Sequence, residues 1–219
     1  MSPSSQENLP AEIDLALAHA QPTYRQSLRI FFELDLRLGR IVAGTNEVML
    51  GQMRLAWWRE TLAKPIAERP NGDVVLDAIG VHWAGREADL IKLVDGWERL
   101  LAEPPLGKED ALAFLMARRD VLMAAYGKYA SGDNKQKSYA KPAWWWVCAD
   151  LAANVSDKEE RAMFVDLGLR FDPIMDRLRK PDKGLHLLGA LAHRALKRGG
   201  RPLMEGRGAS LAALRATIF

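Results

Sequence analysis

An aspartate lies where the sequence otherwise predicts a buried apolar surface. When residues 24–42 are placed on a helix, Asp35 falls in the middle of the apolar face that includes Phe31 and Leu38. A buried carboxylate is costly unless it is paired with a cation, hydrogen-bonded, bound to a metal or protonated. Asp35 is therefore either held in place by an arginine or a backbone N–H, or it faces a ligand.

The next predicted helix, residues 46–64, carries two arginines. It is apolar nearly all round, which is typical of a helix at the centre of a bundle. Arg54 and Arg59 interrupt this apolar surface, and either could neutralise Asp35 or point into a central cavity. Because five residues turn a helix by about 140°, we expect only one of the two to reach Asp35. Arg59 is favoured, since Gln52 shares its face and could orient it.

A third arginine, Arg119, projects among apolar residues of a predicted helix over 108–130. It is either a snorkelling or ion-paired side chain, or a cavity residue. A cavity lined by apolar residues and a few arginines suits a ligand with an anionic head and an apolar tail. The residues expected to surround one such central space are Asp35, Arg54, Arg59, Arg119 and Asp150.

Candidate metal ligands are few. Asp150 and Asn154 stand four residues apart at the end of a predicted helix over 142–154, so they share one helix face. They could hold one Mg²⁺ weakly, or they could simply lie in a solvent-exposed last turn. His186 and His193 are too far apart for a compact two-histidine site, and we expect them on the surface. No residue is assigned a catalytic role.

Helical spacing of apolar residues recurs along the chain, and the alternating pattern of strands is missing. We therefore expect one all-α domain over residues 1–219, with a basic and loosely packed segment at 199–219. Asp73 is a predicted N-cap, Ser156 with Glu159 a predicted capping box, and 131–141 a predicted loop. Pro, Gly and cap residues place the helices at 10–20, 23–43, 46–64, 73–83, 86–102, 108–130, 142–154, 157–171, 183–198 and 208–217.

Composition points to a globular protein of a reducing compartment. Of the 219 residues, 48% are hydrophobic and 27% charged, which argues against disorder. The single cysteine, Cys148, excludes an internal disulfide framework. There is no apolar run of membrane-spanning length and no basic, apolar start typical of a secretory signal. We expect a cytoplasmic protein.

The C-terminal part is strongly basic. From Arg177 onward, ten Lys and Arg residues face only Asp182 and Glu205, a net charge of +8, although the whole chain carries +3. This segment is either a solvated face or a surface that meets anionic lipid at the inner face of a membrane. No nucleic acid partner is expected, because no helix that could read bases is recognisable.

Residues 31–62, FFELDLRLGRIVAGTNEVMLGQMRLAWWRETL, resemble the squalene/phytoene synthase family. The similarity is greatest to short bacterial phytoene synthase-like members, and it extends to a divergent branch that includes a mitochondrial complex I assembly factor. The stretches Leu90–Leu101, Arg118–Gly127 and Trp146–Ser156 fit the same pattern. The resemblance covers residues 10–195 and implies an all-α prenyl-synthase fold with a central apolar cavity.

The family's enzymes join two prenyl diphosphates head to head, with Mg²⁺ held by two helical motifs of acids four residues apart. Here the position four residues after Asp35 is Gly39, and the second motif is reduced to Asp150 and Asn154. The resemblance thus implies a catalytically impaired protein that binds an isoprenoid or another lipid, or that acts in assembly with an unidentified protein partner. The alternative is an active prenyltransferase of isoprenoid, carotenoid or hopanoid biosynthesis with unusual Mg²⁺ ligation.

Overall fold

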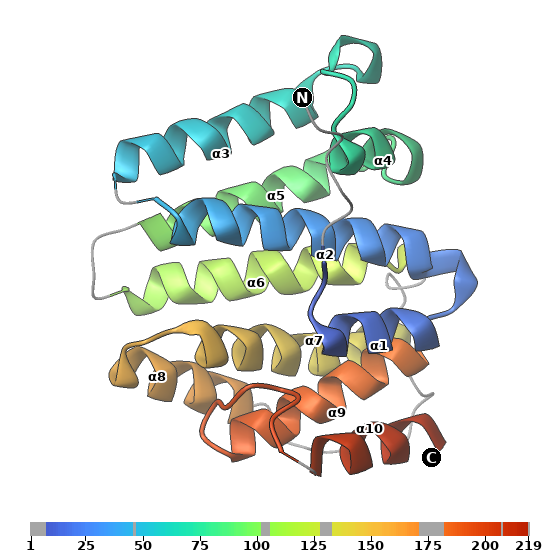
Figure 1. Ribbon diagram of the computed structural model, residues 1–219, viewed down its shortest axis with the longest axis vertical. Coiled ribbons are helices and arrows are strands. Elements are labelled where there is room, and N and C mark those ends of the chain that lie inside the picture. The colour runs from blue at the N-terminus through green and yellow to red at the C-terminus, as the bar shows by residue number, and fades with distance from the viewer. Residues whose placement is uncertain are drawn as a thin grey trace. The chain divides into compact units, whose positions relative to one another are not determined.

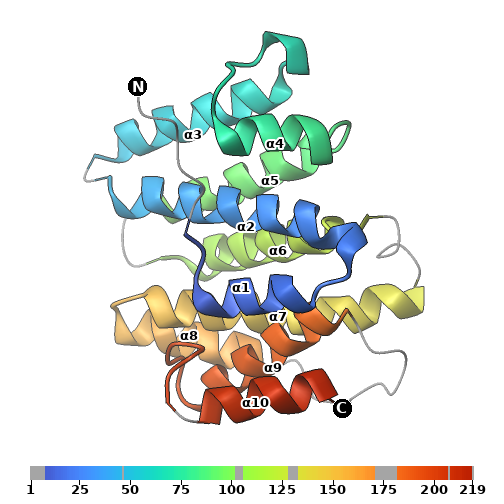
Figure 2. The same cartoon turned by 45° about the vertical axis from the view of Figure 1, so that its right-hand side comes forward.

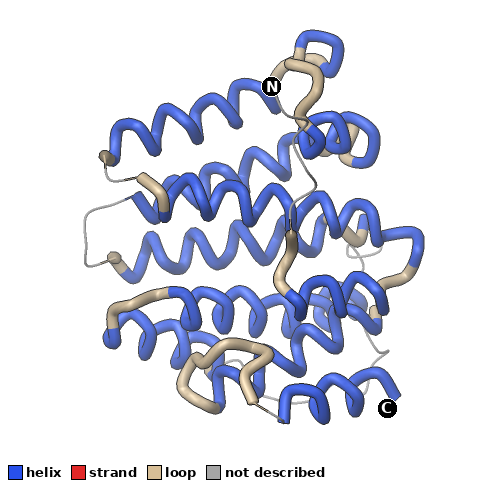
Figure 3. Tube along the Cα trace, in the orientation of Figure 1, coloured by secondary structure: helices blue, strands red, loops and turns tan. Residues whose placement is uncertain are grey.

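The chain is all-α, as the spacing of its apolar residues predicts. The computed structural model describes residues 8–45, 47–101, 106–127, 133–170, 182–206 and 208–218. Within these ranges the regular structure is helical and contains no strand (Figure 3). No helix in the described ranges is long and apolar enough to cross a bilayer.

Most of the predicted helices begin and end within a few residues of the observed ones. The described elements are α1 (Ala11–His19), α2 (Pro22–Ala43), α3 (Val48–Ala63), η1 (Ile66–Glu68), α4 (Val74–His82), α5 (Glu87–Glu98), η2 (Arg99–Leu101), α6 (Lys108–Ala124), α7 (Asp133–Asn154), α8 (Lys158–Leu169), α9 (Lys183–Lys197) and α10 (Gly208–Ile218) (Figure 1).

Aspartates begin three of these helices. Asp73 accepts hydrogen bonds from the backbone N–H groups of Val75 and Leu76, which confirms it as the N-cap of α4. The predicted capping box at Ser156 is wrong by one residue, because Asp157 caps α8 instead. A carboxylate at this position reaches the same free N–H groups as a serine and also complements the positive end of the helix.

The predicted loop over 131–141 is also wrong in part, since α7 begins at Asp133 and continues through Pro142. Polarity misled the prediction, because lysine, glutamine and alanine are good helix formers. Pro142 packs against α9, where a Cβ on Gly189 would lie 2.4 Å from the proline Cβ. Glycine at 189 thus allows the close approach of the two helices.

The chain divides into two compact units. Unit 1 contains residues 1–9 and 26–125, and unit 2 contains residues 10–25 and 126–219. The expectation of a single domain over 1–219 stays a prediction, because contact-dense units occur within single domains as well as between domains.

In unit 1, α5 lies between α3 and α6 and contacts both of them (Figures 1 and 2). Helix α3 was predicted at the centre of a bundle, and this is wrong: its Leu55, Trp58 and Leu62 are buried, but Met49 and Met53 are exposed. A helix can carry apolar side chains on all sides, but each side is buried only where another helix packs against it. In unit 2, α9 contacts α1, α7, α8 and α10.

Candidate functional site

Asp35 is buried, as its position on the apolar face of α2 predicts. Its neighbours on the same face, Phe31, Leu34 and Leu38, are inaccessible to solvent, and Asp35 itself is only 3% exposed. This burial would strongly oppose ionisation without a partner. The carboxylate therefore needs donors from the helices packed against α2.

Arg118 of α6 supplies most of these donors. Its Nε lies 2.9 Å from Oδ1 and 3.0 Å from Oδ2 of Asp35, and its Nη2 lies 2.5 Å from Oδ2. Both side chains are 5% exposed. The two-pronged contact of a guanidinium on a carboxylate is the strong form of this ion pair. Asp35 and Arg118 thus form a buried structural bridge between α2 and α6.

Trp97 of α5 completes the cluster. Its Nε1–H donates to Oδ1 of Asp35 at 2.9 Å, and its ring lies so close to α2 that a Cβ on Gly39 would be 2.9 Å from Cη2. The Trp97 ring also meets Phe114 edge-on, with centroids 4.8 Å apart. Any side chain at position 39, a second carboxylate included, would collide with this indole.

The expected partners of Asp35 were wrong. Arg59 pairs with Asp95 and Glu98 of α5 instead, and its hydrogen bond with Asp95 raises the pKa of Arg59 above its usual value. Arg54 is exposed on α3. Both arginines belong to an edge helix, and neither side chain pairs with α2.

Arg119 was singled out in place of its neighbour. It forms an ion pair with Asp120 near the surface, at 2.6 Å, while Arg118 points inward. The signal for Arg118 was present in the sequence, because it follows Phe114 and Leu115 and precedes Val121 and Leu122, all buried, at helical spacing. Arg54, Arg59 and Arg119 therefore do not converge with Asp35 on a common space in unit 1.

The second candidate site, Asp150 with Asn154, belongs to unit 2. Asn154 Nδ2 donates to the backbone oxygen of Asp150 at 2.8 Å and lies 3.5 Å from its Oδ1. The amide of Asn154 thus satisfies a backbone oxygen in the last turn of α7, as is common at the C-terminal end of a helix. Among the described residues there is no group of three His, Cys, Asp or Glu side chains that could hold a metal ion.

Part of the basic C-terminal segment is internally satisfied. Arg194 and Arg198 donate to the backbone oxygen of Glu205, and Arg201 pairs with its carboxylate at 3.1 Å. Arg177, Arg179, Lys180 and Arg207 lie outside the described residues. Attachment of this segment to an anionic membrane stays a prediction.

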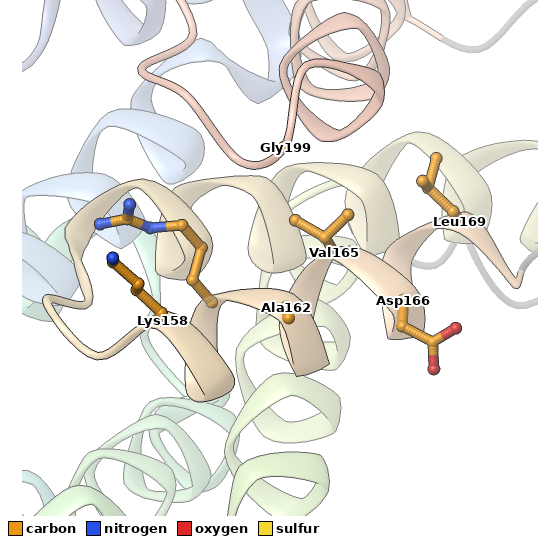
Figure 4. Close-up of a pocket in the computed structure, with 7 residues that line it drawn as sticks. Lys158, Ala162, Val165, Asp166, Leu169 and Gly199 are labelled. Carbon is orange, nitrogen blue, oxygen red and sulfur yellow. The ribbon is translucent and has the colours of Figure 1, made fainter.

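An open groove of about 460 Å³ runs along α8 in unit 2 (Figure 4). Ala162, Val165 and Leu169 form its apolar floor, and Lys158 lies at one end. Arg161 also lines it, but its guanidinium donates to the backbone oxygens of Ala152 and Val155. The arginine is therefore engaged with the C-terminal end of α7, and Lys158 is the cation at that end of the groove that faces solvent.

His193 is not a plain surface residue. Its ring stacks on Trp145 with centroids 4.3 Å apart and an interplanar angle of 20°. Partial burial lowers the pKa of His193 below its usual value, and Lys197 and Lys141 lower it further. The neutral imidazole is thus the form that the folded protein favours.

We expect this histidine to make the protein less stable in mild acid. Because the unfolded chain takes up the proton more readily, stability falls as the pH drops below about 6.5 and imidazole begins to titrate in the unfolded state. Urea unfolding of the wild type and of His193→Phe, which keeps the stacked ring, is to be measured between pH 8 and pH 5. An equal loss of stability in both proteins would contradict the assignment.

The comparisons with known proteins give no relative. No family model matches the chain, and neither a curated protein nor a solved structure matches it. What the chain does must therefore be inferred from its own side chains, and above all from the buried pair of Asp35 and Arg118 with the half-buried Trp97.

Proposed function

We propose that this chain is a squalene/phytoene synthase-like protein that does not join prenyl diphosphates. It acts by binding. What it binds is either an isoprenoid or another lipid, or a protein partner in assembly. The observation that carries the proposal is the state of Asp35. A metal-binding motif needs carboxylate oxygens that are open to the cation and its phosphate. Asp35 instead accepts hydrogen bonds from Arg118 and Trp97, and the Trp97 ring fills the space beside Gly39.

The proposal predicts no prenyl transfer. Purified protein incubated with farnesyl or geranylgeranyl diphosphate and Mg²⁺ should leave the substrates unchanged, because the carboxylate of the first motif is held in an ion pair. Extraction and mass analysis of the apolar products measures this. Asp35→Asn serves as a control, since any product that persists in this variant does not come from a metal held by Asp35.

Metal binding provides a second measurement of the same proposal. Calorimetric titration with Mg²⁺ and a non-hydrolysable prenyl diphosphate should give weak binding or none, because one aspartate and an Asp/Asn pair make a poor cage for a metal cluster. Tight binding of several ions per chain, or formation of a head-to-head condensation product, would establish the active prenyltransferase instead.

A further inference from the structure

Helix α3 exposes a continuous apolar face within unit 1. Met49, Met53 and Trp57 follow one another at intervals of four residues, so they form a stripe along one side of the helix. The exposed fractions are 47% for Val48, 72% for Met49, 44% for Leu50, 63% for Met53 and 43% for Trp57. Trp57 is supported from below by the buried Trp58, whose ring it meets edge-on at 5.2 Å.

The size of this face decides what it can do. Val48 points away from the stripe, but Met49, Leu50, Met53 and Trp57 share one side and expose on the order of 450 Å² of apolar surface, which is the size at which the largest patch of a protein is often functional. Two such faces in contact bury about 900 Å² before the polar rim is counted, and the rim brings the total to the size of the smaller specific protein interfaces. One such face on each of two copies of the chain is therefore large enough to form an interface between them.

Charge favours a protein rather than an anionic bilayer as the occupant. The exposed charged residues on and beside the stripe are of both signs, with Glu47 and Glu60 opposing Arg54 and Lys64. Glu60 lies at the C-terminal end of the stripe, in line with Met49 and Met53, and an anionic membrane surface would repel it. A bilayer that binds a helix face usually meets a rim of net positive charge, whereas here Glu47 and Glu60 balance Arg54 and Lys64.

We propose that two copies of this chain pair through α3, antiparallel, with the two-fold axis at Met53. In this arrangement Met53 meets its own counterpart, and Met49 packs against Trp57 of the second copy, a favourable contact of sulfur with an aromatic ring. The contact of Met49 with Trp57 is made in the antiparallel direction, because parallel pairing would set each of these residues on its own counterpart.

Antiparallel pairing brings the two ends of α3 together. Its N-cap, Glu47, makes no side-chain hydrogen bond to the helix, and the first turn contains no acidic residue. Glu60 lies about 10 Å along the helix from Met53, and antiparallel pairing brings it level with the N-terminus of the other α3. Glu47 already places a carboxylate at this end, so the direction of pairing rests on the contact of Met49 with Trp57 and not on the charges of the helix ends.

The oligomeric state tests the pairing, which goes beyond the proposed function and does not depend on it. Sedimentation velocity of the full chain should show a concentration-dependent dimer. Met53→Glu places two carboxylates face to face at the axis and should weaken the dimer by roughly 100-fold or more. Val81→Glu is the matched control, because Val81 of α4 is 73% exposed and lies outside the stripe.

Cross-linking tests the register. Under mild oxidation, Met53→Cys should form a disulfide between copies, and Val81→Cys should not, because position 81 lies outside the interface. The native Cys148 is buried and should not react in either variant. Circular dichroism of each variant establishes that it folds, as expected for changes at exposed positions.

A monomeric wild type at all concentrations, an undisturbed dimer in Met53→Glu, or equal cross-linking of the two cysteine variants would overturn the proposal. Vesicle sedimentation tests whether the apolar face of α3 binds a lipid bilayer instead of a second copy of the chain. If monomeric wild type binds phosphatidylcholine vesicles and Met53→Glu does not, the face docks on lipid and the dimer is excluded.

Discussion

Replacing Asp35 with alanine is expected to lower the free energy of unfolding by about 3–5 kcal/mol, because it leaves the guanidinium of Arg118 buried without its partner. The two side chains are 5% exposed each and are joined by three contacts of 2.5–3.0 Å. Trp97 loses the acceptor of its indole N–H in the same variant. Urea unfolding followed by circular dichroism measures the change.

The neighbouring arginine provides the matched control. Arg119→Ala removes a near-surface pair with Asp120, which should cost less than about 1 kcal/mol. Replacing Asp35 and Arg118 together by leucine and methionine should restore much of the stability lost in Asp35→Ala, since no charge is then left buried. If Asp35→Ala and Arg119→Ala prove equally mild, the bridge between α2 and α6 is not a stabilising element.

Replacing Asp182 with alanine is expected to cost about 2–4 kcal/mol, the sum of a lost buried helix cap and a lost part-buried hydrogen bond from the Gln21 N–H. Asp182 is 2% exposed and accepts hydrogen bonds from the N–H groups of Gly184 at 2.9 Å and Gln21 at 2.8 Å. It thus begins α9 and also holds the connection between α1 and α2. The measurement is again urea unfolding.

Asp157→Ala is the comparison for this variant. Asp157 caps α8 with contacts of 2.8 and 2.9 Å, but these are exposed to solvent, so water can replace the carboxylate and the cost should be about 1 kcal/mol. Asp182→Asn retains an acceptor oxygen and should recover part of the loss. Equal costs for Asp157→Ala and Asp182→Ala would show that the Gln21 contact contributes nothing.

Local sequence was sufficient for most helix bounds. Asp73 begins α4 and Gly199 follows the end of α9 because a cap oxygen or a glycine with positive φ satisfies the helix terminus within a few residues. The loop predicted over 131–141 failed because polarity alone does not distinguish an exposed helix from a loop. The burial of Asp35 could also be predicted from the sequence, since it depends only on the periodicity of one helix.

The sequence by itself thus determined the all-α class, most of the helices and the presence of a costly buried carboxylate. Only the tertiary structure decided that Arg118 rather than Arg59 neutralises it, and that α3 lies at an edge with Met53 exposed. The reason is physical: one step along a helix rotates a side chain by about 100°, so neighbouring arginines face different surroundings. Which surroundings those are depends on helices far apart in the chain, whose packing no local pattern encodes.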